Sequence, residues 1–429
     1  MMAPRRRAAR RVVAIGGLVA CAIGLVTVAG SANSVRQAGA ESPAVGPNPR
    51  PVARPQPPAP VPEAAQGPAA RTQAAALEGF DPLDHHPVDG KLVSDLPGGR
   101  RAELTLDPDL QAHLESELAR YEVPFGAVVA MEPDTGRIRA YVSHSSAKSD
   151  VGDLCRDATP PAASVFKVVT GSALVDRGVR ADTRVCYGGG FRELTEADLV
   201  DDAQRDRHCE TLATAMGHSI NAIFAKLATR HLDAAALRRY ASAFGFGHAL
   251  PFDAPTEASP MEVPAERLER ARTAAGFWHM HMSPLHGALV AATLANGGQM
   301  PRAAIVERVE DGEGEVLHQH EPSVFRRVIP RATARAVGEM MKRTVDRGTA
   351  KKWFYDTKGR AFLPGIQAAG KTGTLTGEDP YRAYNWWVGF APADGPELAV
   401  AALVVNSPQW RIKAGYLARE ALRHQLVSR

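Results

Sequence analysis

Residues 160–169 have the sequence PPAASVFKVV. Two prolines precede a long apolar run, which is typical of a helix N-terminus, and Gly178 is a suitable terminator. Ser164 then falls in the first turn, and Lys167 lies on the same face of the helix one turn later. The spacing therefore predicts a helix start that presents a hydroxyl beside an amine.

This pairing suits acyl transfer. A serine hydroxyl is a poor nucleophile until a base removes its proton. Lys167 can be that base if burial and neighbouring groups lower its pKa enough to keep the amine neutral. The first amides of a helix lack intrahelical partners, so the N–H of Ser164 can also stabilise a developing oxyanion. We therefore predict Ser164 as a nucleophile.

The Ser-x-x-Lys spacing is a weak signal when it stands alone. It occurs a second time at Ser145 and Lys148. That copy follows a predicted strand in a serine-rich loop, and it has no helix start to orient its serine. We interpret it as a chance match.

Two further motifs strengthen the prediction. Ser219 and Asn221 lie in the sequence GHSINAIFAKLA at residues 217–228, where the hydroxyl can relay a proton and the amide can hold a substrate amide. A Ser-x-Asn triplet is common, and one also occurs at residues 31–33.

The third motif is GKTGT at residues 370–374, at the start of a predicted strand. Lys371 offers a positive charge for a substrate carboxylate, and Gly373 lets a substrate approach the backbone closely. The Thr374 amide would be a second oxyanion donor.

The remaining patterns predict the fold class. Strands are expected first, then a long helical middle, then more strands and a terminal helix. This order predicts an α/β (α+β) sandwich with a largely antiparallel sheet flanked by helices, plus an all-helical subdomain. The predicted strands are residues 102–106, 125–131, 138–142, 368–375, 385–391 and 398–405, and the predicted helices at the two ends are 107–121 and 411–426.

In their order, Ser-x-x-Lys, Ser-x-Asn and Lys-Thr-Gly-Thr resemble the active-site signature of penicillin-binding proteins and serine β-lactamases. The likeness extends from about residue 101 to the C-terminus. The sequences LTLD at 104–107 and GAVVAMEPDTG at 126–136 resemble the start of a high-molecular-weight transpeptidase domain. The sequences SPLH at 283–286 and ANGG at 295–298 resemble a helix of the same domain.

The resemblance implies a D,D-transpeptidase that cross-links peptidoglycan stem peptides, is inhibited by β-lactams and needs no cofactor. Ser164 would form the acyl-enzyme, Lys167 would activate it, and Ser219 would pass a proton to the leaving D-alanine. Water as the acceptor would instead give carboxypeptidase activity. The implied substrate-binding residues are Asn221, Lys371, Thr372, Gly373 and Thr374.

Other activities fit less well. A β-lactamase would need a water-activating glutamate between the second and third motifs, and no Glu-x-x-Leu-Asn sequence occurs there. Penicillin sensors use several membrane spans, whereas this chain has one candidate. A non-catalytic scaffold would be expected to have lost Lys167 or Lys371.

The N-terminal region predicts an anchor and a tether. Residues 1–11 are basic, and residues 12–30 are uncharged and almost wholly apolar, which predicts a cytoplasmic tail and a single uncleaved span with the remainder outside. Cleavage after Ala32 stays open, and Cys21 is interpreted as a membrane-core residue. Residues 31–100, rich in proline and alanine, predict a disordered tether before a domain at 101–429. Neither a glycosyltransferase nor a pedestal domain is expected.

The expected partners are therefore peptidoglycan, the cytoplasmic membrane and, as candidates, other cell-wall synthesis proteins. A net charge of +4, much of it near the N-terminus, gives no basic stripe with interleaved aromatics. Nucleic acid is not an expected partner.

Three cysteines remain for the outer side, and their odd count allows one disulfide. Cys186 and Cys209 form the preferred pair because both lie in the polar insertion at residues 184–210, although three unpaired thiols stay possible. His279, His281 and His286 lie close together without a suitable acidic ligand. They are interpreted as packing or loop residues, and no metal site is expected.

Overall fold

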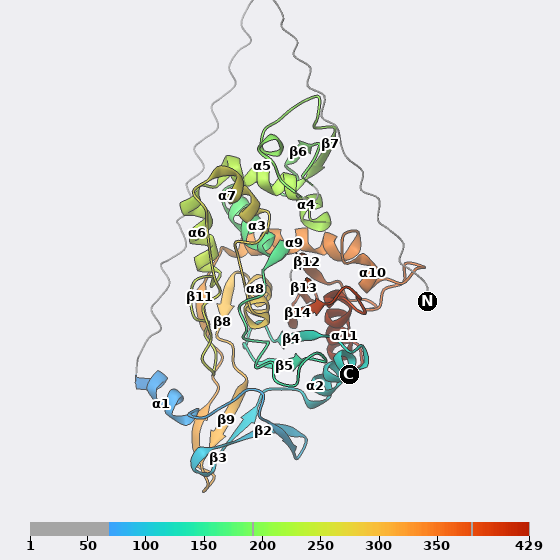
Figure 1. The fold of residues 1–429 in the computed structure, drawn as a ribbon. Coiled ribbons are helices and arrows are strands. Elements are labelled where there is room, and N and C mark those ends of the chain that lie inside the picture. Colours follow the sequence, from blue (N-terminus) through green and yellow to red (C-terminus); the bar gives the residue numbers. More distant parts are fainter. Residues whose placement is uncertain (1–67, 191–192, 379–380, 429) are drawn as a thin grey trace, which may run out of the picture. The chain divides into compact units, whose positions relative to one another are not determined.

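The computed structural model describes residues 68–190, 193–378 and 381–428 (Figure 1). No helix within these ranges is long and apolar enough to cross a membrane. The basic tail predicted at residues 1–11 and the span predicted at 12–30 lie outside the described residues.

A five-stranded antiparallel sheet with the order β12-β13-β14-β4-β5 forms the centre. The predicted hairpin and the three late strands are confirmed within a few residues. The strands are β4 (Phe125–Met131), β5 (Ile138–His144), β12 (Ala369–Glu378), β13 (Tyr381–Ala391) and β14 (Leu398–Asn406). Strands from the two ends of the chain meet here, because β14 pairs with β4.

Both faces of this sheet are covered. Successive residues of β14 point to opposite faces, so Ala401 and Leu403 join one apolar core while Val400 and Ala402 join another. Helices α8 (Pro284–Ala295) and α9 (Arg331–Asp346) pack on the first face. Helices α2 (Pro108–Arg120) and α11 (Ala414–Leu426) pack on the second, so the predicted sandwich is confirmed.

Helices from the middle of the chain pack beyond α9 and form the predicted helical part. The chain enters it through a 3₁₀ turn, η2 (Ala163–Phe166), and leaves it before α8. Its helices are α3 (Lys167–Asp176), α4 (Leu212–His218), α5 (Asn221–His231), α6 (Ala234–Ala243) and α7 (Arg267–Ala274).

The insertion between α3 and α4 is closed by the predicted disulfide. Strands β6 (Arg184–Tyr187) and β7 (His208–Thr211) are antiparallel, and Cys186 lies opposite Cys209, to which it is bonded. A short 3₁₀ turn, η3 (Glu196–Leu199), lies between the two strands. Cys155 is a free, buried thiol.

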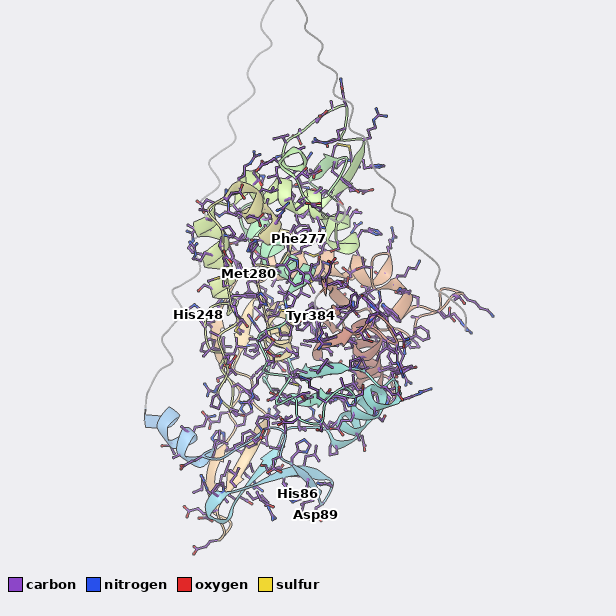
Figure 2. The ribbon with its side chains drawn as sticks, viewed as in Figure 1. His86, Asp89, His248, Phe277, Met280 and Tyr384 are labelled. Carbon is purple, nitrogen blue, oxygen red and sulfur yellow. A yellow bond between two sulfur atoms is a disulfide. The ribbon has the colours of Figure 1, made fainter. Side chains whose placement is uncertain are left out.

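A second sheet lies apart from the catalytic motifs and has the order β1-β2-β3-β9-β10. In Figure 2, His86 and Asp89 mark its β1–β2 hairpin at the bottom of the view, whereas Tyr384 lies in the central sheet. Its strands are β1 (His86–Val88), β2 (Lys91–Leu96), β3 (Arg100–Leu104), β9 (Val306–Glu310) and β10 (Val316–Gln319). The smaller elements elsewhere are α1 (Pro68–Ala76), η1 (Pro97–Gly99), β8 (Gln299–Pro301), β11 (Val324–Arg327) and α10 (Lys351–Phe354).

The prediction of a disordered tether over residues 31–100 is wrong from residue 68 onward. Helix α1 and strands β1 and β2 occupy residues 68–96, so order begins before residue 101. The guanidinium of Arg100 donates hydrogen bonds to the carbonyls of Ala75, Ala76 and Glu78 at the end of α1. Strand β2 pairs with β3, and β3 pairs in turn with β9, about two hundred residues away in the chain. Local composition therefore does not reveal the sheet that orders β1 and β2. The tether residues before 68 lie outside the described ranges.

Glycine is required at one position of β12 and not at another. A Cβ at Gly370 would lie 2.4 Å from the Trp387 ring, whereas a Cβ at Gly377 would meet nothing within 4 Å. We expect Gly370→Ala to lower the free energy of unfolding by about 1–3 kcal/mol through overpacking. Gly377→Ala, the matched control, should leave it nearly unchanged, as measured by urea unfolding. Equal effects of the two substitutions would contradict this packing argument.

Candidate active site

Ser164 lies in the 3₁₀ turn η2, directly before α3. The preceding residue, Ala163, has a positive φ of 50°, so the backbone turns sharply as it presents the serine. Gly276 passes underneath this turn. A Cβ at Gly276 would lie 2.4 Å from the Ala163 carbonyl oxygen and 2.9 Å from the Ser164 Cα. The close approach therefore needs a glycine.

Lys167 is fully buried, and its amine meets neutral groups. Its Nζ lies 2.9 Å from Ser164 Oγ and 2.7 Å from Asn221 Oδ1, and it also donates to the carbonyl of Ala275. Burial, and secondarily the charge of Lys371, hold the pKa of Lys167 well below its ordinary value. A lysine in this state can accept a proton from the serine.

Lys371 and Ser219 form a second contact in the same site. Lys371 Nζ donates to Ser219 Oγ at 3.0 Å and to the Thr372 carbonyl at 2.8 Å. Ser219 caps the C-terminal end of α4 with a left-handed φ of 59°, which turns the chain into α5. Burial lowers the pKa of Lys371 to about 7.

Strand β12 runs beside the serine turn. A Cβ at Gly373 would lie 3.1 Å from the Ala163 Cβ, so the strand and η2 are nearly in contact. On either side of Gly373, hydroxyls are held by other elements. Asn385 Nδ2 donates to Thr374 Oγ1 at 2.8 Å, and Thr372 Oγ1 shares a 2.5 Å hydrogen bond with the Thr349 hydroxyl.

The structure thus brings all the predicted site residues to one place, in two hydrogen-bonded groups. The first consists of Ser164, Lys167 and Asn221, and the second consists of Ser219, Lys371 and Thr372. Gly373 and Thr374 continue along the strand next to them.

Sequence reasoning missed three contributors. The Ala275 carbonyl carries no residue signature, because any amino acid supplies one. Thr349 lies in the turn after α9, outside any motif. Asn385 could have been found, since an asparagine among apolar residues of a predicted strand is unusual and its register partner is Thr374.

The second Ser-x-x-Lys copy has a local structural role. Ser145 Oγ donates to the Pro124 carbonyl at 2.7 Å and accepts hydrogen bonds from the amides of Ala147 and Lys148. The hydroxyl is occupied in a turn, as such side chains often are.

The clustered histidines also have protein partners. His279 Nε2 lies 2.8 Å from Glu269, and the Nδ1 of His281 lies 2.6 Å from the Thr159 carbonyl. His286 is buried, and its Nδ1 lies 2.7 Å from the Ser259 hydroxyl. In the part of the chain that the structure describes, no group of three or more His, Cys, Asp or Glu residues is arranged to hold a metal ion.

A serine turn, a buried lysine and an edge strand with Lys-Thr-Gly-Thr together define a serine acyltransferase of mixed α and β architecture. The family model for the penicillin binding protein transpeptidase domain matches residues 126–427. The chain therefore belongs to the penicillin-binding protein transpeptidase family, as its motifs predict.

Relatives in sequence and structure agree with this assignment. The peptidoglycan D,D-transpeptidase PbpA of Mycolicibacterium smegmatis is 27% identical over 380 residues, covering 78% of this chain and 73% of the relative. The D,D-transpeptidase domain of a peptidoglycan glycosyltransferase from Eggerthella lenta superposes with a TM-score of 0.65 at 25% identity, covering 82% of this chain and 90% of the other. Penicillin-binding protein A of M. tuberculosis, solved as an imipenem acyl-enzyme complex, gives 0.62 at 25% identity over 76% and 79%.

The low pKa of Lys371 predicts how stability varies with pH. Between about pH 7 and 10.5 the unfolded chain holds a proton on this lysine that the folded site does not. The contribution of Lys371 to stability therefore rises with pH across this window. We expect the wild type to gain free energy of unfolding relative to Lys371→Met between about pH 7 and about pH 10. The exposed-site variant Lys358→Met should show no such trend, and a flat difference for Lys371→Met would refute the prediction.

Proposed function

We propose that this protein cross-links peptidoglycan stem peptides as a D,D-transpeptidase with Ser164 as its nucleophile. Family membership supports the reaction class. The observation that carries the assignment of the nucleophile is the buried Lys167 amine, 2.9 Å from Ser164 Oγ and surrounded by neutral acceptors.

Substrate binding is assigned to β12 and the residues that face it. The terminal carboxylate of a donor peptide is held by Lys371 with the hydroxyls of Thr372 and Thr374. A carboxylate beside Lys371 raises the pKa of that lysine. Binding of a substrate therefore favours the protonated, charged form of the Lys371 amine. Asn221 holds the peptide backbone, and Gly373 lets the peptide approach the strand.

Acylation then proceeds in balanced steps. Lys167 takes the proton of Ser164, and Oγ attacks the carbonyl between the two D-alanines. The amides of Ser164 and Thr374 hold the oxyanion. The C–N bond breaks, and the proton passes by way of Ser219 to the amine of the leaving D-alanine. An ester on Ser164 remains.

Deacylation sets the type of product. The amine of a second peptide attacks the ester, the C–O bond to Ser164 breaks, and the serine recovers a proton. Water in place of the amine gives a carboxypeptidase. A β-lactam enters by the same acylation, and penicillin-binding protein A of M. tuberculosis forms such an acyl-enzyme with imipenem.

The first test is labelling of the detergent-solubilised full chain with a fluorescent penicillin. The wild type should give a stable band, and Ser164→Ala should give none while keeping the same urea unfolding midpoint. Labelling of Ser164→Ala would refute the nucleophile. A band that fades within seconds would indicate a β-lactamase.

Lys167→Arg tests the base. Arginine keeps the positive charge at every accessible pH and cannot accept the proton, so acylation should slow by about a hundredfold to ten-thousandfold. In the wild type the acylation rate should fall as pH decreases, because protonation removes the lone pair on Lys167. A rate independent of pH, or an unimpaired Lys167→Arg enzyme, would exclude this role.

Product analysis separates the two peptide activities. We expect the wild type, given a D-Ala-D-Ala peptide and a peptide amine, to form the cross-linked product and to release D-alanine. Release of D-alanine without a cross-link under the same conditions would identify a carboxypeptidase.

We also propose that the enzyme is held at the cytoplasmic membrane. Residues 12–30 would anchor it, and the basic residues before them would stay inside, leaving the catalytic domain at the cell wall. Membrane fractionation followed by extraction with alkaline carbonate tests this, since an anchored chain stays in the pellet.

A further inference from the structure

The disulfide-closed insertion, defined here as residues 184–211, has no role in the reaction described above. It nevertheless continues directly into the site. Its second strand, β7, leads into α4, whose C-cap is Ser219. Helix α5 then begins at Asn221, and the insertion lies against that helix.

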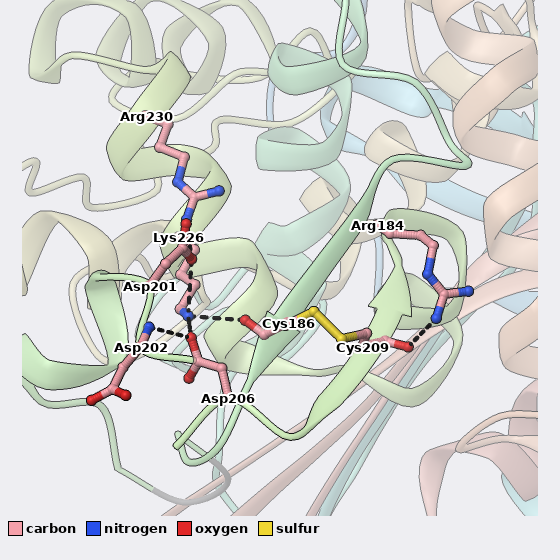
Figure 3. The surroundings of a disulfide bond; sticks show 8 residues. All are labelled: Arg184, Cys186, Asp201, Asp202, Asp206, Cys209, Lys226 and Arg230. Carbon is pink, nitrogen blue, oxygen red and sulfur yellow. Dashed lines mark hydrogen bonds and ion pairs between the residues drawn. A yellow bond between two sulfur atoms is a disulfide. The ribbon is translucent and has the colours of Figure 1, made fainter. Parts of the chain in front are cut away.

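A buried ion pair joins the insertion to α5. The Lys226 side chain is 0% exposed and the Asp206 side chain 4%, and their charged groups are directly bonded (Figure 3). Lys226 also donates to the Cys186 carbonyl at 2.9 Å and contacts Asp201 at 3.3 Å. Arg230, one turn further along α5, bonds Asp201 at 2.5 Å. The insertion thus binds one face of α5 through these two basic residues.

The pair requires its partners to stay in place. A buried ammonium without a carboxylate partner strongly destabilises the folded state. Separation of Lys226 from Asp206 is therefore unfavourable unless water hydrates both charges. Burial by itself would raise the pKa of the Asp206 carboxyl, but the hydrogen bond from Lys226 holds it below its ordinary value. The insertion is therefore fixed to α5 by a specific contact as well as by packing.

The insertion also contacts the two places that supply acceptors to Lys167. A Cβ at Gly190 would lie 2.9 Å from the Cβ of Ala222, the residue after Asn221. The Leu194 carbonyl accepts a hydrogen bond from Arg272 of α7 at 2.7 Å, and α7 is followed by Ala275. The insertion thus touches the elements that carry the Asn221 amide and the Ala275 carbonyl.

We propose that Lys226 is a positioning residue: through Asp206 of the insertion it fixes α5 so that Asn221 keeps its amide oxygen on the Lys167 amine. This inference rests on the proposed function of Ser164 and Lys167. The insertion then belongs to the catalytic apparatus, although none of its described residues, 184–190 and 193–211, is hydrogen-bonded to Ser164 or Lys167.

The alternative is that the ion pair only stabilises the fold, and the pH profile of acylation distinguishes the two. The Lys167 amine faces the Ser164 hydroxyl, the Asn221 oxygen, the Ala275 carbonyl, the Phe224 ring and the titratable amine of Lys371. An acceptor oxygen favours the charged amine, so loosening Asn221 lowers the pKa of Lys167. The acidic limb of the profile should then move to lower pH while the maximal rate falls.

The test compares acylation rates of the full chain with a fluorescent penicillin. We expect Lys226→Met to reduce the maximal second-order rate constant about tenfold to a hundredfold, as misplacement of a reacting group does. Asp206→Asn, which keeps the size of the side chain, should act in the same direction, and Lys226→Arg should recover most of the rate. Asp206→Asn carries the test if Lys226→Met does not fold.

A matched control is Arg137→Met. Arg137 bonds Glu307 at 2.7 and 2.9 Å, and it precedes β5, the edge of the central sheet opposite β12. This variant should lose stability yet keep the wild-type rate and pH profile. Wild-type rates in folded Lys226→Met and Asp206→Asn would overturn the positioning role. Absence of labelling in the wild type would instead overturn the proposed function.

Discussion

The amine of Lys167 is buried among a hydroxyl, an amide oxygen and a main-chain carbonyl. Most of the other contacts in the site hold these three groups around the amine. A carboxylate partner would stabilise the ammonium and abolish its use as a base. Neutral acceptors hold the amine in place without that effect. Each acceptor comes from a different element, so the turn η2, the helix α5 and the loop after α7 must meet at one point.

Close backbone approaches make this meeting possible. Gly276 lets the loop after α7 run against the serine turn, and Gly373 lets β12 lie beside it. The central sheet supplies the rigid support, since β12 is paired along its whole length with β13. Lys371 lies on that strand, and the charge that it carries when protonated lowers the pKa of Lys167 further.

The sequence predicted the central sheet and the motif residues because their signals are local. Alternating apolar residues, a proline-marked helix start and a Lys-Thr-Gly-Thr strand can each be recognised within ten residues. The contacts that complete the site span much more of the chain: Lys167 meets Asn221 54 residues later and the Ala275 carbonyl 108 residues later. The same limit explains the error at residues 68–100, because β2 joins a sheet in which β3 pairs with the distant β9. The pairing of Cys186 with Cys209 was predictable because both lie in one insertion.

The Ala275 carbonyl differs from the other groups that hold Lys167, because no point substitution can delete a main-chain oxygen. Variation at position 275 changes the side chain and leaves the acceptor. Under prolonged β-lactam exposure, a bacterium cannot remove this part of the drug target by changing the residue that supplies it. Adaptive change must instead shift the path of the loop, and the close packing of residue 276 against the serine turn leaves that path little room.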